Sequence, residues 1–191
     1  QNIQRLTEPS NFNPEPGNEE NLTELKKLIQ KQSLDLGFAF DGDGDRIVAV
    51  LRNGQVLRGD EIMVFLTRDV LGNSPQGKII YDIKCSSVLK DEIKKLGGEG
   101  IMSATGHSII KQRMCSEGAV LGGELSGHIY IADGYYGFDD GIYAAVRLLS
   151  YFSKQGRSPE ELHDELPKTI KSPEIKIPCE DKFDRVEKIK E

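Results

Sequence analysis

The chain has 191 residues, of which 31 are acidic and 25 basic, and its formal net charge is −6. This composition is typical of a globular protein with one large domain or two small ones. The sequence has no basic stripe for nucleic acid and no apolar run long enough to cross a bilayer, so we expect neither partner and a cytoplasmic location. Cys85, Cys115 and Cys179 are odd in number and widely spaced, which predicts reduced and mostly buried thiols.

The first third of the chain alternates apolar runs with turn signals. Its expected elements are strands over 2–6, 36–40, 47–51 and 55–57, helices over 21–29 and 59–71, and a loop over 9–18. Asn53 and Gly54 favour a tight hairpin turn before the fourth of these strands. Asp60 and Glu61 suit the first turn of the second helix because acids there complement the helix dipole. Residues 41–46 are therefore expected to form a loop between the strands over 36–40 and 47–51.

After an expected linker over 73–77, strands and helices alternate regularly. The expected elements are strands over 78–83, 100–103, 119–121, 129–132 and 174–177, and helices over 86–96, 108–116, 138–154 and from 158 onward. Asp139 and Asp140 are expected to cap the start of the long helix, and Gly156 its end. This order predicts an α/β protein with mixed sheets flanked by helices.

Residues 41–46 read Asp-Gly-Asp-Gly-Asp-Arg and lie between two apolar strands. Asp41, Asp43 and Asp45 alternate along a flexible loop, so their carboxylates can converge on one cation. Two carboxylates about 5 Å apart repel by roughly 3 kcal/mol at an effective dielectric constant of about 20. Oxygen ligands alone favour Mg²⁺, and Arg46 offers a cation for a phosphate. The loop therefore predicts a magnesium site beside an anionic substrate.

Two other interpretations of this loop are weaker. A calcium-binding EF-hand loop needs Gly at its sixth position and Glu at its twelfth, where this chain has Arg46 and Arg52. A plain polar turn would need fewer acids and fewer glycines than the loop contains.

A second constellation follows an expected strand. Glu124, Ser126 and His128 alternate in a segment with glycines at 122, 123 and 127, so these three side chains can point to one side. An acceptor, a hydroxyl and a titratable ring are suited to binding sugar hydroxyls and moving a proton. The same residues could equally be a surface acid and a strand-edge histidine, and the pattern alone does not decide between the two.

Two smaller signals accompany it. His107 stands at a strand-to-helix junction after Thr105 and Gly106, where helix N–H groups could receive a phosphate. Lys84 follows another strand, although lysines at such positions are more often only solvated.

Together these motifs resemble the α-D-phosphohexomutase family, and within it the phosphomannomutase/phosphoglucomutase branch. The motifs concerned are residues 41–46, Gly123 to His128 and Tyr135 to Tyr143. The resemblance implies three-layer αβα domains. It also implies interconversion of hexose 6-phosphate and hexose 1-phosphate through a phosphoserine and a bisphosphorylated intermediate. Leu125 stands where the glucosamine-type branch usually has Gln, which favours mannose or glucose phosphate.

By this resemblance, each motif acquires a role. Asp41, Asp43 and Asp45 would be Mg²⁺ ligands, and Arg46 would lie near the reactive phosphate.

The sugar-binding residues follow from the same resemblance. Glu124 and Ser126 would take the 3- and 4-hydroxyls, while Lys84 and His107 would line the active site. Either Lys84 or His128 would handle the hydroxyl proton.

The resemblance also divides the chain. Residues 1–74 would be the C-terminal part of family domain 2, residues 75–180 domain 3, and residues 181–191 the start of a linker to domain 4. We expect a piece of a larger protein that lacks domain 1 with its Ser-His-Asn-Pro segment, lacks domain 4, and is inactive alone. Ala104 departs from relatives with a basic residue there, which weakens a phosphate contact at that position. The alternative is a non-catalytic phosphosugar- or metal-binding module.

Overall fold

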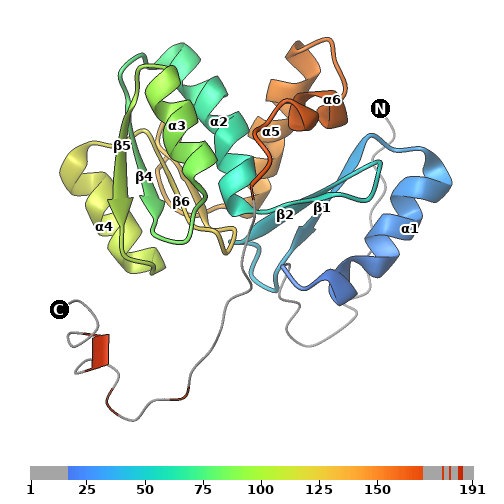
Figure 1. The fold of residues 1–191 in the computed structure, drawn as a ribbon, viewed down its shortest axis with the longest axis horizontal. Coiled ribbons are helices and arrows are strands. Elements are labelled where there is room, and N and C mark those ends of the chain that lie inside the picture. Colours follow the sequence, from blue (N-terminus) through green and yellow to red (C-terminus); the bar gives the residue numbers. More distant parts are fainter. Residues whose placement is uncertain (1–16, 170–177, 179–180, 182–184, 187–191) are drawn as a thin grey trace.

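The computed structural model describes residues 17–169 together with 178, 181 and 185–186 (Figure 1). The strands are β1 (Leu36–Phe40), β2 (Ile47–Leu51), β3 (Val56–Leu57), β4 (Lys78–Asp82), β5 (Glu99–Ser103), β6 (Leu121–Gly123) and β7 (Ile129–Ile131). The helices are the 3-10 helix η1 (Glu19–Leu22) and α1 (Thr23–Gln32), α2 (Gly59–Asn73), α3 (Ser87–Lys95), α4 (His107–Glu117), α5 (Gly141–Lys154) and α6 (Pro159–Asp164). The strands predicted over 2–6 and 174–177 lie outside the described residues.

These strands form two sheets. The first is antiparallel with the order β1-β2-β3, and the second is mixed with the order β5-β4-β6-β7. In the second sheet β4 pairs in parallel with both β5 and β6, whereas β6 and β7 are antiparallel. The prediction of an α/β protein with mixed sheets flanked by helices is confirmed.

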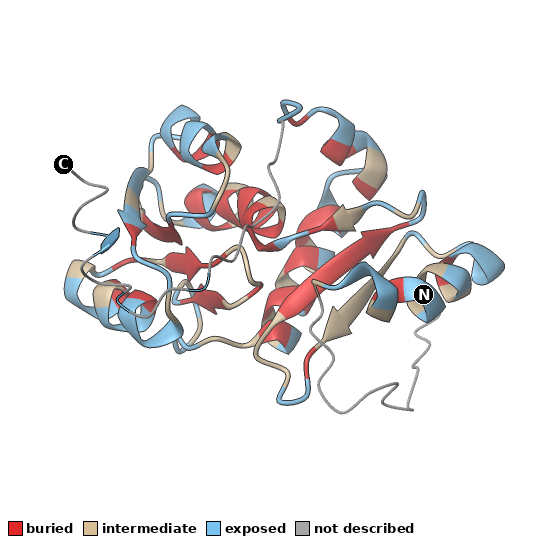
Figure 2. Ribbon diagram, turned by 60° about the horizontal axis from the view of Figure 1, so that its bottom comes forward, coloured by how far each residue is buried: buried red, intermediate tan, exposed pale blue. Residues whose placement is uncertain are grey.

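The first sheet separates two apolar layers. Val48 and Val50 on one face of β2 pack with Leu22 and Ile29 of the η1–α1 segment. The alternate residues of β2 belong to the main core, which also contains side chains of α2 and α5. Because successive strand residues point to opposite faces, a strand covered on both sides must be apolar throughout, and β2 is fully buried (Figure 2).

The second sheet is the middle layer of an αβα sandwich. Ile79 and Tyr81 of β4 face the core that contains α2 and α3, whereas Ile80 between them packs with Ile110 and Met114 of α4. Figure 1 shows α2 and α3 side by side over the sheet and α4 apart from them. The three-layer arrangement agrees with the prediction.

Helix α2 is the element shared by the two sheets. Ten of its residues are buried, and its side chains join those of β2, β4 and β6 in one core. Phe65 lies at its centre, fully buried, with its ring centroid 5.0 Å from that of Phe152 in α5. Burial of one such side chain contributes roughly 1.5–3 kcal/mol. The core is therefore continuous between the sheets.

Several predicted boundaries differ from the structure: the helix predicted over 21–29 ends at Gln32, the one predicted over 59–71 ends at Asn73, and two further shifts have a clear cause. The helix predicted from 138 begins at Gly141, because the Asp140 side chain accepts a hydrogen bond from Tyr143 N at 2.8 Å and Asp139 pairs with Tyr130 in a β-bridge. The strand predicted over 119–121 lies over Leu121–Gly123, because its pairing with β4 runs from Leu121 to Gly123.

The prediction of mostly buried cysteines is only partly met. Cys85 is half-buried, but Cys115 is exposed on α4, and Cys179 lies outside the described residues. Both described cysteines are free thiols. None of the helices in the described part of the chain is long and apolar enough to span a membrane.

The N-terminus of α2 makes a close contact that can be tested. A Cβ atom on Gly59 would lie 2.0 Å from the carbonyl oxygen of Glu124, whereas Gly72 in the same helix has no atom within 4 Å of its Cβ position. We expect Gly59→Ala to lower the free energy of unfolding by about 1–3 kcal/mol, because the added methyl displaces backbone. Gly72→Ala, the control, should raise it by up to about 1 kcal/mol. Denaturant unfolding measures both, and equal effects would contradict the contact.

Candidate functional site

The acidic loop at residues 41–46 connects β1 to β2 and is closed by a contact between its first and last residues. Asp41 Oδ1 accepts a hydrogen bond from Arg46 N at 3.1 Å, and Asp41 Oδ2 accepts one from Arg46 Nε at 2.5 Å. Burial on its own would raise the pKa of Asp41, but the hydrogen bonds and positive charge of Arg46 lower it below its ordinary value. Asp41 is therefore held as a carboxylate.

The loop brings its three aspartates together. Asp41, Asp43 and Asp45 each offer one carboxylate oxygen, and these oxygens lie within 4.8 Å of one another. Burial raises the pKa of Asp45; His128 opposes this rise, and the carboxylates of Asp41 and Asp43 increase it. Asp45 Oδ1 is buried, and no described residue forms a hydrogen bond to it. An all-oxygen donor set with an unpartnered buried oxygen fits a hard divalent cation.

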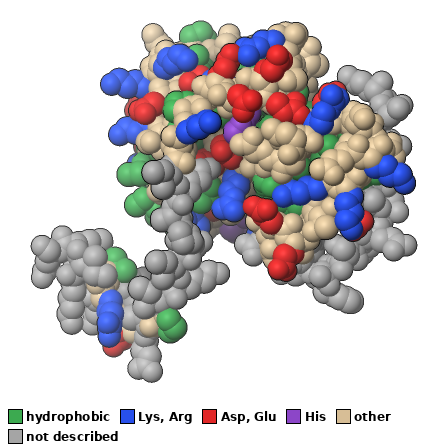
Figure 3. All heavy atoms as spheres, turned by 45° about the vertical axis from the view of Figure 1, so that its right-hand side comes forward, with side chains coloured by type: hydrophobic (Ala, Val, Ile, Leu, Met, Phe, Trp, Pro, Cys, Tyr) green, Lys and Arg blue, Asp and Glu red, His purple; other side chains and the backbone are tan. Residues whose placement is uncertain are grey.

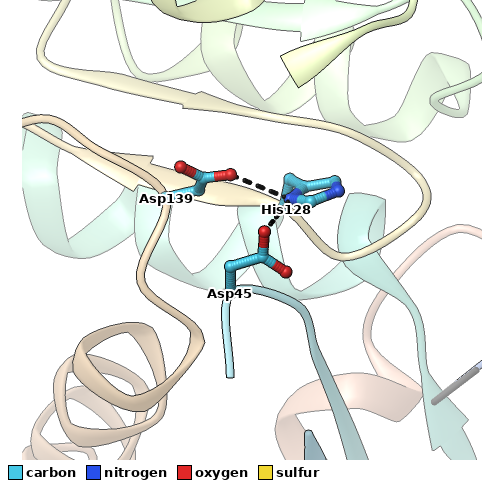
Figure 4. Close-up of side chains that lie close together, drawn as sticks. All are labelled: Asp45, His128 and Asp139. Atoms are coloured by element: carbon cyan, nitrogen blue, oxygen red, sulfur yellow. Dashed lines mark hydrogen bonds and ion pairs between the residues drawn. The ribbon is translucent and has the colours of Figure 1, made fainter. Parts of the chain in front are cut away.

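His128 lies between two carboxylates from separate segments. Its Nδ1 atom is 3.0 Å from Asp139 Oδ2 and 3.5 Å from Asp45 Oδ2 (Figure 4). Asp45 comes from the acidic loop and Asp139 from the segment before α5. Ligand atoms of these three residues also lie within 4.8 Å of one another.

Asp139 is the residue that the sequence interpretation missed, since it was predicted to cap the helix together with Asp140. The Asp140 side chain caps α5, and the Asp139 side chain instead contacts His128. A helix needs only one N-cap side chain. The presence of two adjacent acids, Asp139 and Asp140, was therefore the signal that one of them has another role.

The segment from Glu124 to His128 forms a tight turn between β6 and β7. Glu124 N donates to His128 O at 3.0 Å, and Gly127 N donates to Glu124 O at 3.0 Å. The Glu124 side chain is buried, with Ser126 Oγ donating to its Oε2 at 3.3 Å. Glu124 Oε1 is buried without a hydrogen-bond partner among the described residues. The turn thus places Glu124 and Ser126 together, whereas His128, which was predicted to point to the same side, lines a pocket that the other two do not line.

This turn is attached directly to the acidic loop. Ile47 N donates to Gly127 O at 3.1 Å, and Arg46 and His128 form an isolated antiparallel bridge. Gly127 has φ +102°, and a Cβ atom there would lie 2.5 Å from Ile47 O. Only glycine adopts this conformation at so short a distance without strain.

Five of the predicted site residues line one open pocket of about 420 Å³. Its lining consists of Asp41, Gly42, Asp43, Asp45, Arg46 and His128. The ring of His107 stacks beside that of His128, with centroids 6.1 Å apart. Lys84 is exposed on the loop after β4 and does not line this pocket, and neither do Glu124 and Ser126. On the face drawn in Figure 3, acidic and basic side chains are interspersed.

The chain matches known families over most of its length. The model described as "Phosphoglucomutase/phosphomannomutase, alpha/beta/alpha domain III" matches residues 58–170, and the corresponding domain II model matches residues 3–54. The chain therefore belongs to the phosphoglucomutase/phosphomannomutase family.

Named relatives agree with this assignment. The chain is 44% identical to the phosphomannomutase/phosphoglucomutase of Pseudomonas putida over 171 residues, which are 90% of this chain and 37% of that protein. It is 36% identical to the phosphomannomutase of Methanocaldococcus jannaschii over 89% of this chain and 38% of that protein. The chain thus spans little more than a third of the length of these relatives.

A solved structure shares the fold. It is a phosphoglucomutase/phosphomannomutase family protein from Burkholderia thailandensis, with a TM-score of 0.81 and 38% identity over 86% of this chain and 36% of that one. The phosphohexomutase type of αβα fold is confirmed.

The Asp41–Arg46 contact predicts a pH dependence. Because the folded-state pKa of Asp41 lies below the ordinary value of 3.8, its carboxylate stabilises the fold above that pH, and this contribution is lost as the pH falls through the folded-state pKa. In metal-free buffer at pH 7, Asp41→Asn should lower the free energy of unfolding by about 1–3 kcal/mol. The difference from wild type should narrow steadily below pH 3.8.

Denaturant unfolding between pH 7 and pH 3 measures this difference. Asp35→Asn is the control, because Asp35 pairs with Arg52 at the surface and its side chain is 69% exposed. A gap between wild type and Asp41→Asn that is constant with pH would contradict the assigned ion pair.

Proposed function

We propose that this chain is part of a mutase that interconverts hexose 6-phosphate and hexose 1-phosphate, with mannose or glucose as the sugar. The observation that carries the proposal is the attachment of the Glu124–His128 turn to the acidic loop, with His128 of the turn lining the pocket of that loop. A cation site and a set of sugar-binding groups then lie side by side, as phosphoryl transfer to and from a sugar requires. Membership of the family supports the same reaction.

The acidic loop is proposed to hold Mg²⁺ through Asp41, Asp43 and Asp45. The convergence of their oxygens and the unpartnered buried oxygen of Asp45 support this assignment. A bound Mg²⁺ would neutralise negative charge on the transferring phosphoryl group. Arg46 lines the same pocket and donates to Asp41 through Nε, and its planar, permanently charged guanidinium is proposed to contact the phosphate.

The Glu124–His128 turn is proposed to bind the sugar. Glu124 and Ser126 would take two neighbouring hydroxyls, and the buried oxygen of Glu124 that lacks a described partner is consistent with an acceptor role. His107 would lie next to the bound phosphosugar, because its ring stacks beside that of His128.

Proton transfer is proposed for His128 or Lys84. His128 is the better placed of the two because it lines the pocket, whereas Lys84 is exposed outside it. Asp139 would orient the His128 ring through Nδ1 at 3.0 Å and leave Nε2 for the substrate hydroxyl. Lys84 would take this role only if its loop turned toward the substrate.

The remaining machinery is proposed to come from the rest of a longer cytoplasmic protein. Residues 1–74 and 75–180 would be parts of two of its domains, with residues 181–191 leading to another. A phosphoserine outside this sequence would donate the phosphoryl group, and a further domain would bind the substrate's other phosphate. The chain spans 37% of the Pseudomonas putida relative, which leaves room for both. A non-catalytic phosphosugar- or metal-binding module is the alternative.

The metal assignment is tested in the full-length protein. Asp43→Asn removes a charged oxygen ligand, so mutase turnover on glucose 1-phosphate and mannose 1-phosphate should fall by roughly 100-fold or more, with weaker Mg²⁺ binding by calorimetry. Asp91→Asn, a matched change of an exposed acid on α3, should leave both unchanged. Near-normal turnover of Asp43→Asn would exclude a metal role for this loop.

Residues 1–191 alone should bind Mg²⁺ yet show no mutase turnover, because the proposed phosphoserine lies elsewhere. Coupled assays of this piece beside the full-length protein separate the two candidate functions. Turnover only in the longer protein supports the mutase. Absence of turnover in both, with Mg²⁺ or phosphosugar binding retained, supports the binding module.

A further inference from the structure

A buried carboxylate outside the pocket connects three loops. Asp82, the last residue of β4, is fully buried and accepts hydrogen bonds from three separate segments. Its Oδ1 accepts from Cys85 Sγ at 3.1 Å and from Leu125 N at 3.3 Å, and its Oδ2 accepts from Thr105 Oγ1 at 3.0 Å. In the described part of the chain, Asp82 forms no ion pair with Lys, Arg or His. Neutral donors from three loops therefore satisfy this carboxylate.

Each donor stands beside a residue that the proposed function places at the substrate. Cys85 follows Lys84 directly, and Leu125 lies between Glu124 and Ser126.

Thr105 is the third donor, two residues before His107. The three segments thus have one common acceptor, although they leave three different strands.

The topology explains why this position can reach all three. Strand β4 lies between β5 and β6, with both of which it pairs in parallel, so the carboxyl ends of the three strands meet at one edge of the sheet. Asp82 ends the middle strand and can contact the loop on either side as well as its own.

A second carboxylate, at the N-terminus of α2, supports the same loop. Asp60 is 1% exposed, and its Oδ2 accepts from Ser86 N at 3.2 Å. The loop after β4 is therefore held at Cys85 by Asp82 and at Ser86 by Asp60. Burial of a carboxylate costs free energy unless its oxygens accept hydrogen bonds. Each loop is therefore held in the conformation that keeps its donor on the carboxylate.

We propose that Asp82 is a positioning residue that fixes the loops carrying Lys84, His107 and the Glu124–Ser126 pair relative to one another. It does not touch the substrate. The proposal rests on the proposed function, in which these loops bind one phosphosugar together. Displacement of a substrate-binding group by about 1 Å can reduce a rate by about 100-fold. Because Asp82 holds all three loops, its loss would displace the binding groups of all three together.

The test uses the full-length protein and four changes. Asp82→Ala removes all three acceptor contacts. Asp82→Asn keeps one oxygen for Leu125 and Cys85, while the Thr105 hydroxyl can turn and accept from the new amide. Thr105→Val removes one donor and Thr105→Ser restores it. Glu92→Ala is the matched control, because Glu92 is a buried carboxylate whose side chain pairs with Arg68 on α2 and Lys95 on α3 instead of with donors from the three loops.

Two readouts are measured for each variant. Asp82→Ala should raise KM and lower kcat/KM by about 10- to 100-fold, and Asp82→Asn should recover part of that loss. Loss of folded protein alone would lower the apparent kcat and leave KM unchanged. Hydrogen exchange of backbone amides should become at least roughly tenfold faster over 84–87, 104–107 and 124–128 together in Asp82→Ala. In Thr105→Val it should change only over 104–107, and Thr105→Ser should reverse this.

The outcomes are distinct. Joint loosening of the three loops with a raised KM, absent in Glu92→Ala, supports the proposal. Unchanged exchange in all three loops, or loosening of one loop only in Asp82→Ala, overturns it. If Asp82→Ala does not fold, Asp82→Asn and Thr105→Val provide the test. Hydrogen exchange and KM equal to those of wild type in both variants would overturn the proposal. A wild-type protein without mutase turnover contradicts the proposed function, while the exchange data still decide the role of Asp82.

Discussion

The backbone contact between the start of β2 and the Glu124–His128 turn is the constraint on which the site depends. Ile47 N donates to Gly127 O, and Arg46 pairs with His128 in a β-bridge, so the acidic loop and the turn share one fixed position. Gly141 N donates to Gly44 O at 3.0 Å and attaches the start of α5 to the same loop. Asp45, His128 and Asp139 meet because these backbone contacts bring three segments of distant sequence together. The side-chain geometry therefore follows from main-chain pairing between the two sheets.

The charge balance of the pocket bears directly on the proposed cation. Three aspartates line it, whereas Arg46 is the only permanently charged cation among the described residues of its lining, and His128 is titratable. Arg46 is already paired with Asp41. The pocket carries net negative charge unless a cation is added. Its electrostatic potential would therefore repel an approaching phosphate. The same carboxylates that disfavour the anion provide oxygen ligands for the ion that would attract it.

The sequence predicted elements well where a local pattern specifies them. The strands of the first sheet, the start of α2 at Gly59 and the Ser158 cap of α6 needed only apolar alternation or capping residues. The convergence of the acidic loop also followed from local spacing. The start of α5 could not be predicted in this way, because Asp139 is withdrawn from the helix by His128, a partner 11 residues away that meets it only through sheet pairing. The anchoring of three loops by Asp82 was likewise invisible, since strand order determines it.

The hydrogen bond from Cys85 to Asp82 has a consequence for the chemical reactivity of the protein. Burial and the neighbouring Asp82 carboxylate raise the pKa of the Cys85 thiol far above its ordinary value. The thiolate, which is the form that alkylating agents and peroxides attack, is therefore absent at neutral pH. Of the two cysteines that the structure describes, exposed Cys115 is the one open to oxidants and to labels. A dye or spin probe attached there would report on α4, the helix that follows the Thr105 loop.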